Sequence, residues 1–202
     1  MRRDDAIREV LDAMATVDGA VFTSNGNNSR AGYALGDRPL NFYVMGSMGQ
    51  CAPLAAGFSS MTGLPTAVLD GDGAVAMGMA GLPLVASTAR PPFLHVVLDN
   101  GLYETTGGQR VPVPDGLLTA AARGARYNDI ITACDERELA DALRKTLMGE
   151  RVAFIQVLIA ADSSHQYPRV PFHPQEIADR FMAATTGSTP RTPPSPRASS
   201  QS

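Results

Sequence analysis

Continuous apolar runs divide the chain into predicted strands. Each of five runs predicts one strand, and the five runs cover 20–23, 42–46, 66–70, 93–99 and 152–160. They are apolar almost throughout instead of alternating, which is typical of strands buried on both faces. His95 lies inside one of these runs, so we expect it to be a core residue and not a catalytic one.

Helical spacing of apolar residues separates these runs. The clearest stripe lies in residues 4–15, and further helices are predicted at 49–61, 77–88, 115–125 and 135–148. Asp135 is the expected N-cap of the last one, with Glu138 three residues later. Buried strands that alternate with helices predict an α/β fold, an open and mostly parallel sheet with helices on both faces.

The composition changes near the end of the chain. Residues 185–202 contain mainly Pro, Ser, Thr and Arg, with little to bury, so we expect a disordered tail there. The remainder, 1–184, is predicted to form one domain with a full-sized core, because the 202-residue chain is long enough for one.

Composition and charge exclude several classes of partner. The chain is 44% hydrophobic and 18% charged, with a net charge of −3 and no basic block, which argues against nucleic acid or an anionic membrane as the main partner. No run approaches the roughly 18 apolar residues that a membrane span needs, and the N-terminus lacks the apolar segment of a signal peptide. We therefore expect a cytoplasmic protein with Cys51 and Cys134 reduced.

Polar residues follow two of the predicted strands. Run 66–70 leads into Gly71, Asp72 and Gly73, and after 25 intervening residues, 74 through 98, Asp99 and Asn100 end another. The glycines are expected to allow a sharp turn and the close approach of another group. If a helix crosses back to a neighbouring parallel strand, a carboxylate and an amide oxygen meet, a donor set that suits Mg²⁺ bound to a phosphorylated ligand. Alone, this GDG segment fits an ordinary turn as well.

The combined pattern, GDG and then DN, resembles the cofactor motif of thiamine-diphosphate enzymes. The resemblance implies that the side chains of Asp72 and Asn100 and the carbonyl of Leu102 bind Mg²⁺. Asp99 stands where the commoner pattern has asparagine, a position that is not a metal ligand.

Two further segments resemble the same family. Segment 45–49, MGSMG, resembles one whose large apolar residue, here Met48, holds the cofactor bent, although Met48 also fits ordinary core packing. Segment 24–30, SNGNNSR, resembles a loop that holds the diphosphate, although by itself it fits a turn. The resemblance implies cofactor contacts at Ser24, Gly26, Asn27, Gly46, Ser47, Met48, Gly71, Asp72, Gly73, Ala74, Asn100, Leu102 and Tyr103.

The resemblance narrows to two related decarboxylases. The segments NFYVMGSMGQ, VLDGDGA, LHVVLDNGLYETTGGQ and PFHPQEIADRFMA together resemble phosphonopyruvate decarboxylase and the β subunit of sulfopyruvate decarboxylase, over residues 4–184. TGGQ favours the first, which implies conversion of 3-phosphonopyruvate to phosphonoacetaldehyde and CO₂; the alternative product is sulfoacetaldehyde. Ala31 departs from the pattern, since an acid often follows the arginine there.

The resemblance also suggests which residues meet the substrate, a small anionic 2-oxo acid. Catalytic candidates are Met48, Glu104 and Thr106, and substrate-binding candidates are Arg30, Thr105 and Gly107. Other interpretations stay open: Arg30 as a surface residue or a diphosphate ligand, Glu104 as a solvated side chain, and the loop at 105–108 as a cap over the metal.

Full enzymes of this kind also carry a pyrimidine domain whose glutamate activates the cofactor. No glutamate of this chain matches that position, so the resemblance implies a separate pyrimidine-domain (α) subunit in an α₂β₂ or larger assembly, with the active site at the interface. The alternatives are half of a carboligase or of a 2-oxo acid oxidoreductase, and a non-catalytic assembly subunit. The presence of Met48, Asp72 and Asn100 argues against the last.

Overall fold

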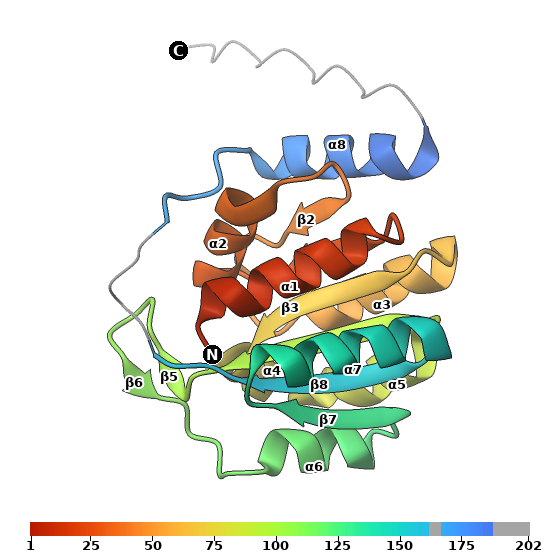
Figure 1. Ribbon diagram of the computed structural model, residues 1–202. Helices are drawn as coiled ribbons and strands as arrows, with labels where there is room; N and C mark the ends of the chain where they lie inside the picture. Colours follow the sequence, from red (N-terminus) through yellow and green to blue (C-terminus); the bar gives the residue numbers. More distant parts are fainter. Residues whose placement is uncertain (162–166, 188–202) are drawn as a thin grey trace, which may run out of the picture.

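A single six-stranded sheet forms the centre of the molecule. The structure is a computed structural model that describes residues 1–161 and 167–187. The strand order is β2-β1-β3-β4-β8-β7, and every neighbouring pair is parallel, as predicted. The strands are β1 (Ala20–Thr23), β2 (Asn41–Tyr43), β3 (Thr66–Gly71), β4 (Phe93–Asp99), β7 (Asp129–Ala133) and β8 (Val152–Leu158) (Figure 1).

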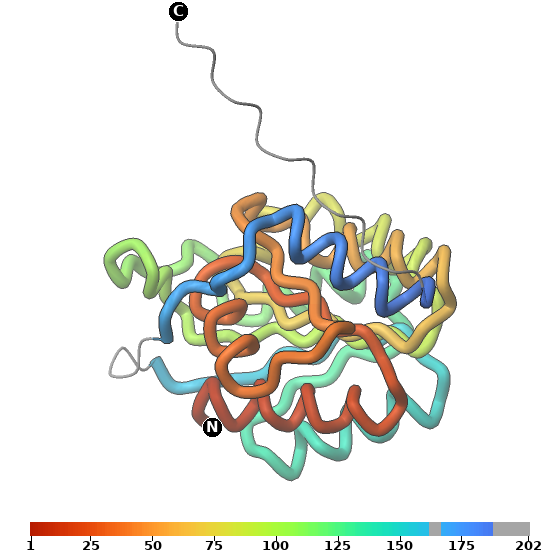
Figure 2. The backbone as a smooth tube through the Cα atoms, turned by 90° about the horizontal axis from the view of Figure 1, so that it is seen from above, coloured from red at the N-terminus to blue at the C-terminus, as the bar shows by residue number. Residues whose placement is uncertain are grey.

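Helices cover both faces of the sheet. One hydrophobic core joins the sheet to α1 (Arg3–Ala15), α2 (Asn27–Gly36) and α7 (Glu136–Gly149). The other core joins it to α3 (Cys51–Thr62), α4 (Asp72–Met77), α5 (Leu82–Thr88), α6 (Leu117–Gly124) and α8 (Pro174–Thr186), and η1 (Met79–Gly81) links α4 to α5. Figure 2 shows α1 and α7 together on one side of the sheet. The predicted α/β architecture is therefore confirmed.

Alternate side chains of each central strand fill the two cores. In β4, Leu94, Val96 and Leu98 pack in one core, and Phe93 and Val97 pack in the other. This two-sided burial explains why the strand sequences are continuously apolar instead of alternating.

Several elements were not predicted. Helix α2 replaces the loop expected after β1, and α4 begins at Asp72 directly after β3, where a turn was expected. Strand β7, the hairpin of β5 (Leu102–Tyr103) and β6 (Gln109–Arg110), and α8 were also missed.

The predicted start of α7 is confirmed. The Glu138 amide donates to the Asp135 carboxylate at 2.8 Å, so Asp135 caps the helix. At the other end of the chain, α8 runs through Thr186, so residues 185 and 186 are helical, and the rest of the expected tail, from residue 188, lies outside the described residues.

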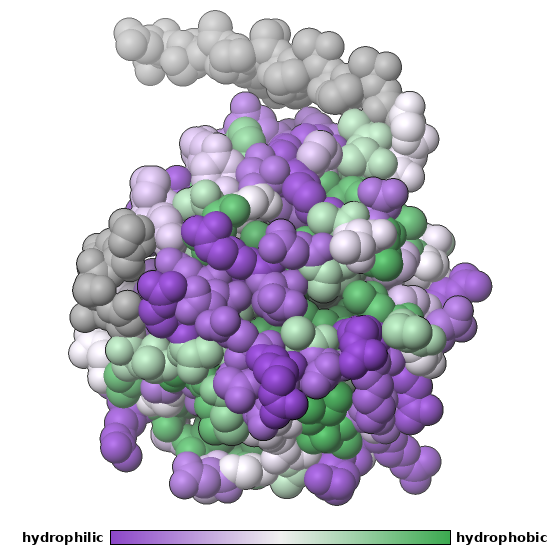
Figure 3. Space-filling view, viewed as in Figure 1, coloured by the Kyte–Doolittle hydropathy of each residue, from purple (hydrophilic) through white to green (hydrophobic). Residues whose placement is uncertain are grey.

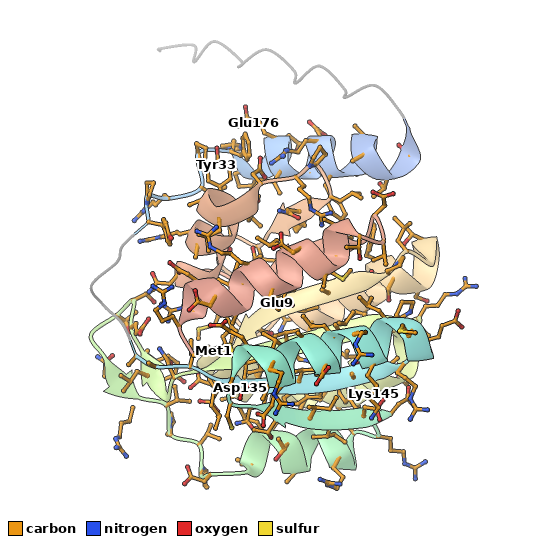
Figure 4. The ribbon with its side chains drawn as sticks, viewed as in Figure 1. Met1, Glu9, Tyr33, Asp135, Lys145 and Glu176 are labelled. Carbon is orange, nitrogen blue, oxygen red and sulfur yellow. The ribbon has the colours of Figure 1, made fainter. Side chains whose placement is uncertain are left out.

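Aromatic side chains attach α8 to the edge of the sheet. Phe181 of α8 packs on Phe22 and Phe42 with ring centroids 5.2 Å apart. Beside it, Tyr33 of α2 meets Phe172 edge to face at 5.6 Å, near the N-terminal end of α8, where Figure 4 labels Tyr33 and Glu176 (Figure 4). The terminal helix is thus part of the folded domain.

The surface over α1 and α7 is mainly hydrophilic, with hydrophobic side chains exposed between polar ones (Figure 3). Within residues 1–161 and 167–187, no helix is both long and apolar enough to cross a membrane. Cys51 is buried, Cys134 is exposed and both are free thiols.

Candidate functional site

A hollow lies where strands β1, β3 and β4 end. Strand β1 has β2 on one side and β3 on the other, so the direction of winding reverses at β1, and ligands of open α/β sheets bind at such a point. In Figure 1 the hairpin β5–β6 and the N-terminus lie toward this carboxyl end of the sheet. The hollow is lined by Arg3, Ser24, Asn25, Asn27, Asn28, Met48, Gly71, Asp72, Gly73, Ala74, Leu98, Asn100, Leu102, Tyr103, Glu104 and Thr105.

The three expected metal ligands lie together in it. Pairing of Gly71 with Leu98 brings the start of α4 beside the loop after β4. The Asp72 carboxylate accepts the Gly101 amide at 2.9 Å across this junction, and the Asn100 side-chain oxygen accepts the Leu102 amide at 3.0 Å. The predicted neighbourhood of Asp72 and Asn100 is confirmed, and their roles as ligands stay predictions.

The electrostatics of Asp72 suit a bound cation. Burial first, and then the nearby Asp99 carboxylate, raise the pKa of this carboxyl from 3.8 to about 6, against the opposing effect of amide bonds from Gly73 and Gly101. Asp99 is in turn held by the Gln156 side-chain amide at 2.6 Å. A buried carboxylate with an unfavourable negative charge gains from a neighbouring cation.

The donor atoms fit magnesium. Among the described residues, no three His, Cys, Asp or Glu side chains form a metal-binding group. One carboxylate, one amide oxygen and one backbone carbonyl form an all-oxygen set that leaves positions for phosphate and water, which is the usual protein environment of Mg²⁺. The residues present therefore fit a phosphorylated cofactor bound through Mg²⁺.

The N-terminus of α2 forms a second wall of the hollow. The helix starts at Asn27 after Gly26, which has φ +85° and offers no side chain to cap the first amides. The preceding turn is fixed by Ser29, whose hydroxyl donates to the Ser24 carbonyl at 2.6 Å. A helix N-terminus attracts anions, so the expectation of a diphosphate cradle in this segment gains support, although the backbone is helical and not a loop.

The surroundings of Gly71 and Gly73, the two glycines of the GDG segment, differ in how much room they leave for a side chain. Neither has a positive φ, so the turn from β3 into α4 uses backbone conformations that residues other than glycine also adopt. A Cβ on Gly73 would lie 2.3 Å from Cε1 of the Tyr103 ring, whereas a Cβ on Gly71 would meet only the Asn28 side chain, at 3.7 Å. The expected close approach is therefore real at Gly73, where the Tyr103 ring packs on the first turn of α4.

Some predicted site residues lie elsewhere. Gly26, Gly46 and Arg30 line a neighbouring hollow, and Arg30 does not reach the first one. Ser47 is exposed on the loop before Met48, and Thr106 and Gly107 are exposed in the β5–β6 turn, outside the hollow. These residues lie outside the first hollow, and their contacts with cofactor or substrate stay predictions.

Sequence reasoning missed Arg3, Asn25, Asn28 and Leu98 as lining residues. Arg3 forms an ion pair with Glu104, whose side chain is only 9% exposed. Glu104 is therefore not the solvated side chain that the sequence allowed. No local motif could have linked Arg3 to Glu104, because they lie 101 positions apart.

A second group of ionisable residues is buried behind the hollow. His95 is 1% exposed, as predicted for a core residue, and its Nδ1 lies 2.9 Å from the Tyr127 hydroxyl. Its Nε2 lies 3.5 Å from Oδ2 of buried Asp70. Burial and then the Asp70 charge raise the pKa of Tyr127, which keeps its hydroxyl protonated.

Comparisons with known proteins agree with the site. The family model described as the C-terminal TPP binding domain of thiamine pyrophosphate enzymes matches residues 25–157. A phosphonopyruvate decarboxylase of Streptomyces viridochromogenes is 35% identical over 181 residues, which cover 90% of this chain and 46% of that protein. The chain thus spans about half the length of that relative. A sulfopyruvate decarboxylase subunit beta of Methanothermobacter thermautotrophicus is 29% identical, over 94% of this chain and 98% of the relative.

Solved structures share the fold. The benzoylformate decarboxylase of Polynucleobacter necessarius superposes with a TM-score of 0.65 at 17% identity, covering 79% of this chain and 33% of the other. A 2-oxoglutarate:ferredoxin oxidoreductase of Magnetococcus marinus gives a TM-score of 0.66 at 18% identity, covering 92% and 75%.

Proposed function

The chain belongs to the thiamine pyrophosphate enzymes, with their C-terminal cofactor-binding domain, and from this membership we propose that it binds thiamine diphosphate and Mg²⁺ for a decarboxylase of 3-phosphonopyruvate. The products are phosphonoacetaldehyde and CO₂. The catalytic glutamate comes from a pyrimidine-domain partner subunit.

One observation carries the proposal. Asp72, at 5% exposure, faces the loop of Asn100 and Leu102 across two adjacent parallel strand ends, and the Gly101 amide joins the two segments. An isolated buried carboxylate is costly, so a site that holds one beside two further oxygen donors favours a cation.

The residues of the chain have separate tasks. Asp72, Asn100 and the Leu102 carbonyl hold Mg²⁺, and the N-terminus of α2 faces the diphosphate. Met48, at the edge of the hollow, supports the cofactor from the side of the loop at 45–49. Bound thiamine diphosphate supplies an acceptor for the electron pair that remains when CO₂ leaves. Tyr103, packed on Gly73, limits the access of water to the metal.

The position of Glu104 supports the proposal of a partner subunit. The glutamate that lines the hollow, Glu104, pairs with Arg3 and is bonded by Asn27 at 3.2 Å, and its sequence context does not match that of the activating glutamate. We therefore assign the activating carboxylate to a second chain, and the active site to the interface of an α₂β₂ or larger assembly.

The experiment co-expresses this chain with a pyrimidine-domain subunit from the same organism and supplies thiamine diphosphate, Mg²⁺ and phosphonopyruvate. We expect release of CO₂ and aldehyde only when both chains are present, and loss of Mg²⁺-dependent cofactor binding in Asp72→Ala. Full turnover by this chain alone would overturn the partner assignment. Cofactor binding without turnover of either oxo acid would indicate a non-catalytic subunit.

Sulfopyruvate is the second candidate substrate. It is favoured by the match to a sulfopyruvate decarboxylase subunit beta over 98% of that relative, whereas the match to phosphonopyruvate decarboxylase covers 46%. Parallel assays with both oxo acids distinguish them, because turnover of sulfopyruvate alone would move the chain to this alternative.

A further inference from the structure

The N-terminal helix contributes a cation to the candidate site. Arg3 is the first residue of α1, its side chain is 12% exposed, and it lines the same hollow as Asp72. Its guanidinium pairs with the Glu104 carboxylate, which also accepts the Asn27 side-chain amide at 3.2 Å. The pair joins the wall made by α1 to the wall made by the β5–β6 turn.

The hydrogen bonding of this arginine is incomplete. Within the described parts of the chain, the buried Nε of Arg3 has no acceptor. A guanidinium presents several donors in one plane and is suited to two parallel bonds with one oxyanion, so the buried, unmet Nε is a donor that an oxyanion gains only if the Glu104 carboxylate moves aside.

The charges around the hollow single out Arg3. Among the lining residues that the structure describes, Asp72 and Glu104 are acidic and Arg3 alone is basic. Arg30 lies in an adjoining pocket with Arg3, Asp4 and Tyr167. An anion with several charges that enters beside Asp72 therefore meets the guanidinium of Arg3 and not that of Arg30.

We propose that Arg3 binds a phosphate-type oxyanion in this hollow and that the Glu104 carboxylate occupies the guanidinium until the oxyanion replaces it. Both carboxylate and phosphate match the planar guanidinium, and a phosphate group carries more negative charge than a carboxylate at neutral pH. The inference rests on the proposed function, which supplies two such oxyanions, the diphosphate of the cofactor and the phosphonate of the substrate.

The exchange makes opposite predictions for the two members of the pair. Arg3→Ala removes the cation, so we expect binding of inorganic pyrophosphate and of thiamine diphosphate with Mg²⁺ to weaken by about tenfold. Glu104→Gln removes the competing charge, so we expect the same affinities to rise by a few fold. Arg2→Ala is the matched control, because Arg2 is 72% exposed and pairs with Asp5.

The measurement is calorimetric titration of the full chain in complex with its pyrimidine-domain subunit. Thermal unfolding of each variant accompanies it, and Arg3→Lys replaces Arg3→Ala if the alanine variant does not fold. A purely structural ion pair predicts that the Arg3 and Glu104 variants move the anion affinities and the KM for phosphonopyruvate in the same direction or leave all of them unchanged, and either result overturns the exchange.

The arms of the experiment separate the sources of the oxyanion. Weaker pyrophosphate binding in Arg3→Ala assigns the arginine to the diphosphate. Unchanged pyrophosphate binding with a tenfold higher KM for phosphonopyruvate, and lower KM in Glu104→Gln, assigns it to the substrate. No change in either overturns the inference while leaving the proposed function intact. Arg3-dependent pyrophosphate binding without decarboxylation supports the inference and overturns the proposed function. A wild-type complex that binds neither anion refutes both the inference and the proposed function.

Discussion

The two glycines that flank Asp72 provide a matched pair of substitutions. Gly73→Ala places a methyl group 2.3, 2.9 and 3.1 Å from three atoms of the Tyr103 ring, inside van der Waals contact. Gly71→Ala places the same group 3.7 Å from the Asn28 side chain, at an ordinary distance and with an ordinary φ of −110°. The same chemical change therefore tests two positions on either side of one carboxylate.

The magnitude follows from the contact that must be relieved. The Tyr103 ring has to move by about 1 Å or rotate away, and overpacking of this kind costs roughly 1–3 kcal/mol. Alanine returns about 1 kcal/mol in a helix, so the net loss at Gly73 is up to about 2 kcal/mol. For a domain of this size that loss lowers the Tm by roughly 2–4 °C per kcal/mol. Gly71→Ala is expected to stay within about 0.5 kcal/mol of the wild type.

Chemical denaturation measures the stability, and titration of thiamine diphosphate with Mg²⁺ measures the effect on the site. Movement of Tyr103 displaces the neighbouring Leu102 carbonyl, so we expect weaker cofactor binding in Gly73→Ala. We expect unchanged cofactor binding in Gly71→Ala. The double variant Gly73→Ala with Tyr103→Ala removes the contact and should recover stability relative to the sum of the single changes. Equal stability and equal binding of the two alanine variants would refute the reasoning.

Three other changes have defined outcomes. Because the pKa of Asp72 is raised to about 6, protons compete with the metal, so the Mg²⁺ affinity measured by calorimetry should fall as the pH drops through 6. The raised pKa has the opposite effect on the metal-free fold, which gains stability from this group as the pH drops through the same range and loses it as the pH rises. Tyr127→Phe leaves the buried Nδ1 of His95 without its partner and should lower the free energy of unfolding by about 1–3 kcal/mol, measured with urea. Asp135→Ala removes the cap on the Glu138 amide and should cost about 1 kcal/mol by the same assay; no loss would contradict the capping role.

The sequence predicted the elements whose signal is continuous. Buried parallel strands such as β4 are apolar along their whole length, and α7 carries both a stripe and a cap, so both were found with nearly correct bounds. Strand β7 was missed because only its last residue is fully buried, which weakens its pattern. Helix α2 was missed because its start, NNSR, is polar and resembles a turn, and tertiary contacts decide its conformation.

The site was predictable where the ends of two neighbouring strands supplied its residues. Asp72 and Asn100 were recognised because a crossover of ordinary length had to bring their strands together. Arg3 could not be recognised, since its position in the hollow depends on how α1 packs across the sheet. Arg30 illustrates the converse, because closeness in sequence to the α2 N-terminus did not put its side chain into the hollow.

The position of β8 between β4 and β7 has a consequence for biosynthesis. All described residues that line the hollow lie between Arg3 and Thr105. One edge of β4 pairs with β3, and its other edge pairs with β8, which is synthesised about 50 residues later. Until then the apolar sequence Phe93–Asp99 is an open edge, the type of surface that pairs with other chains. A nascent or truncated chain that stops before Val152 should therefore aggregate through β4, although it already contains every residue of the candidate site that the structure describes.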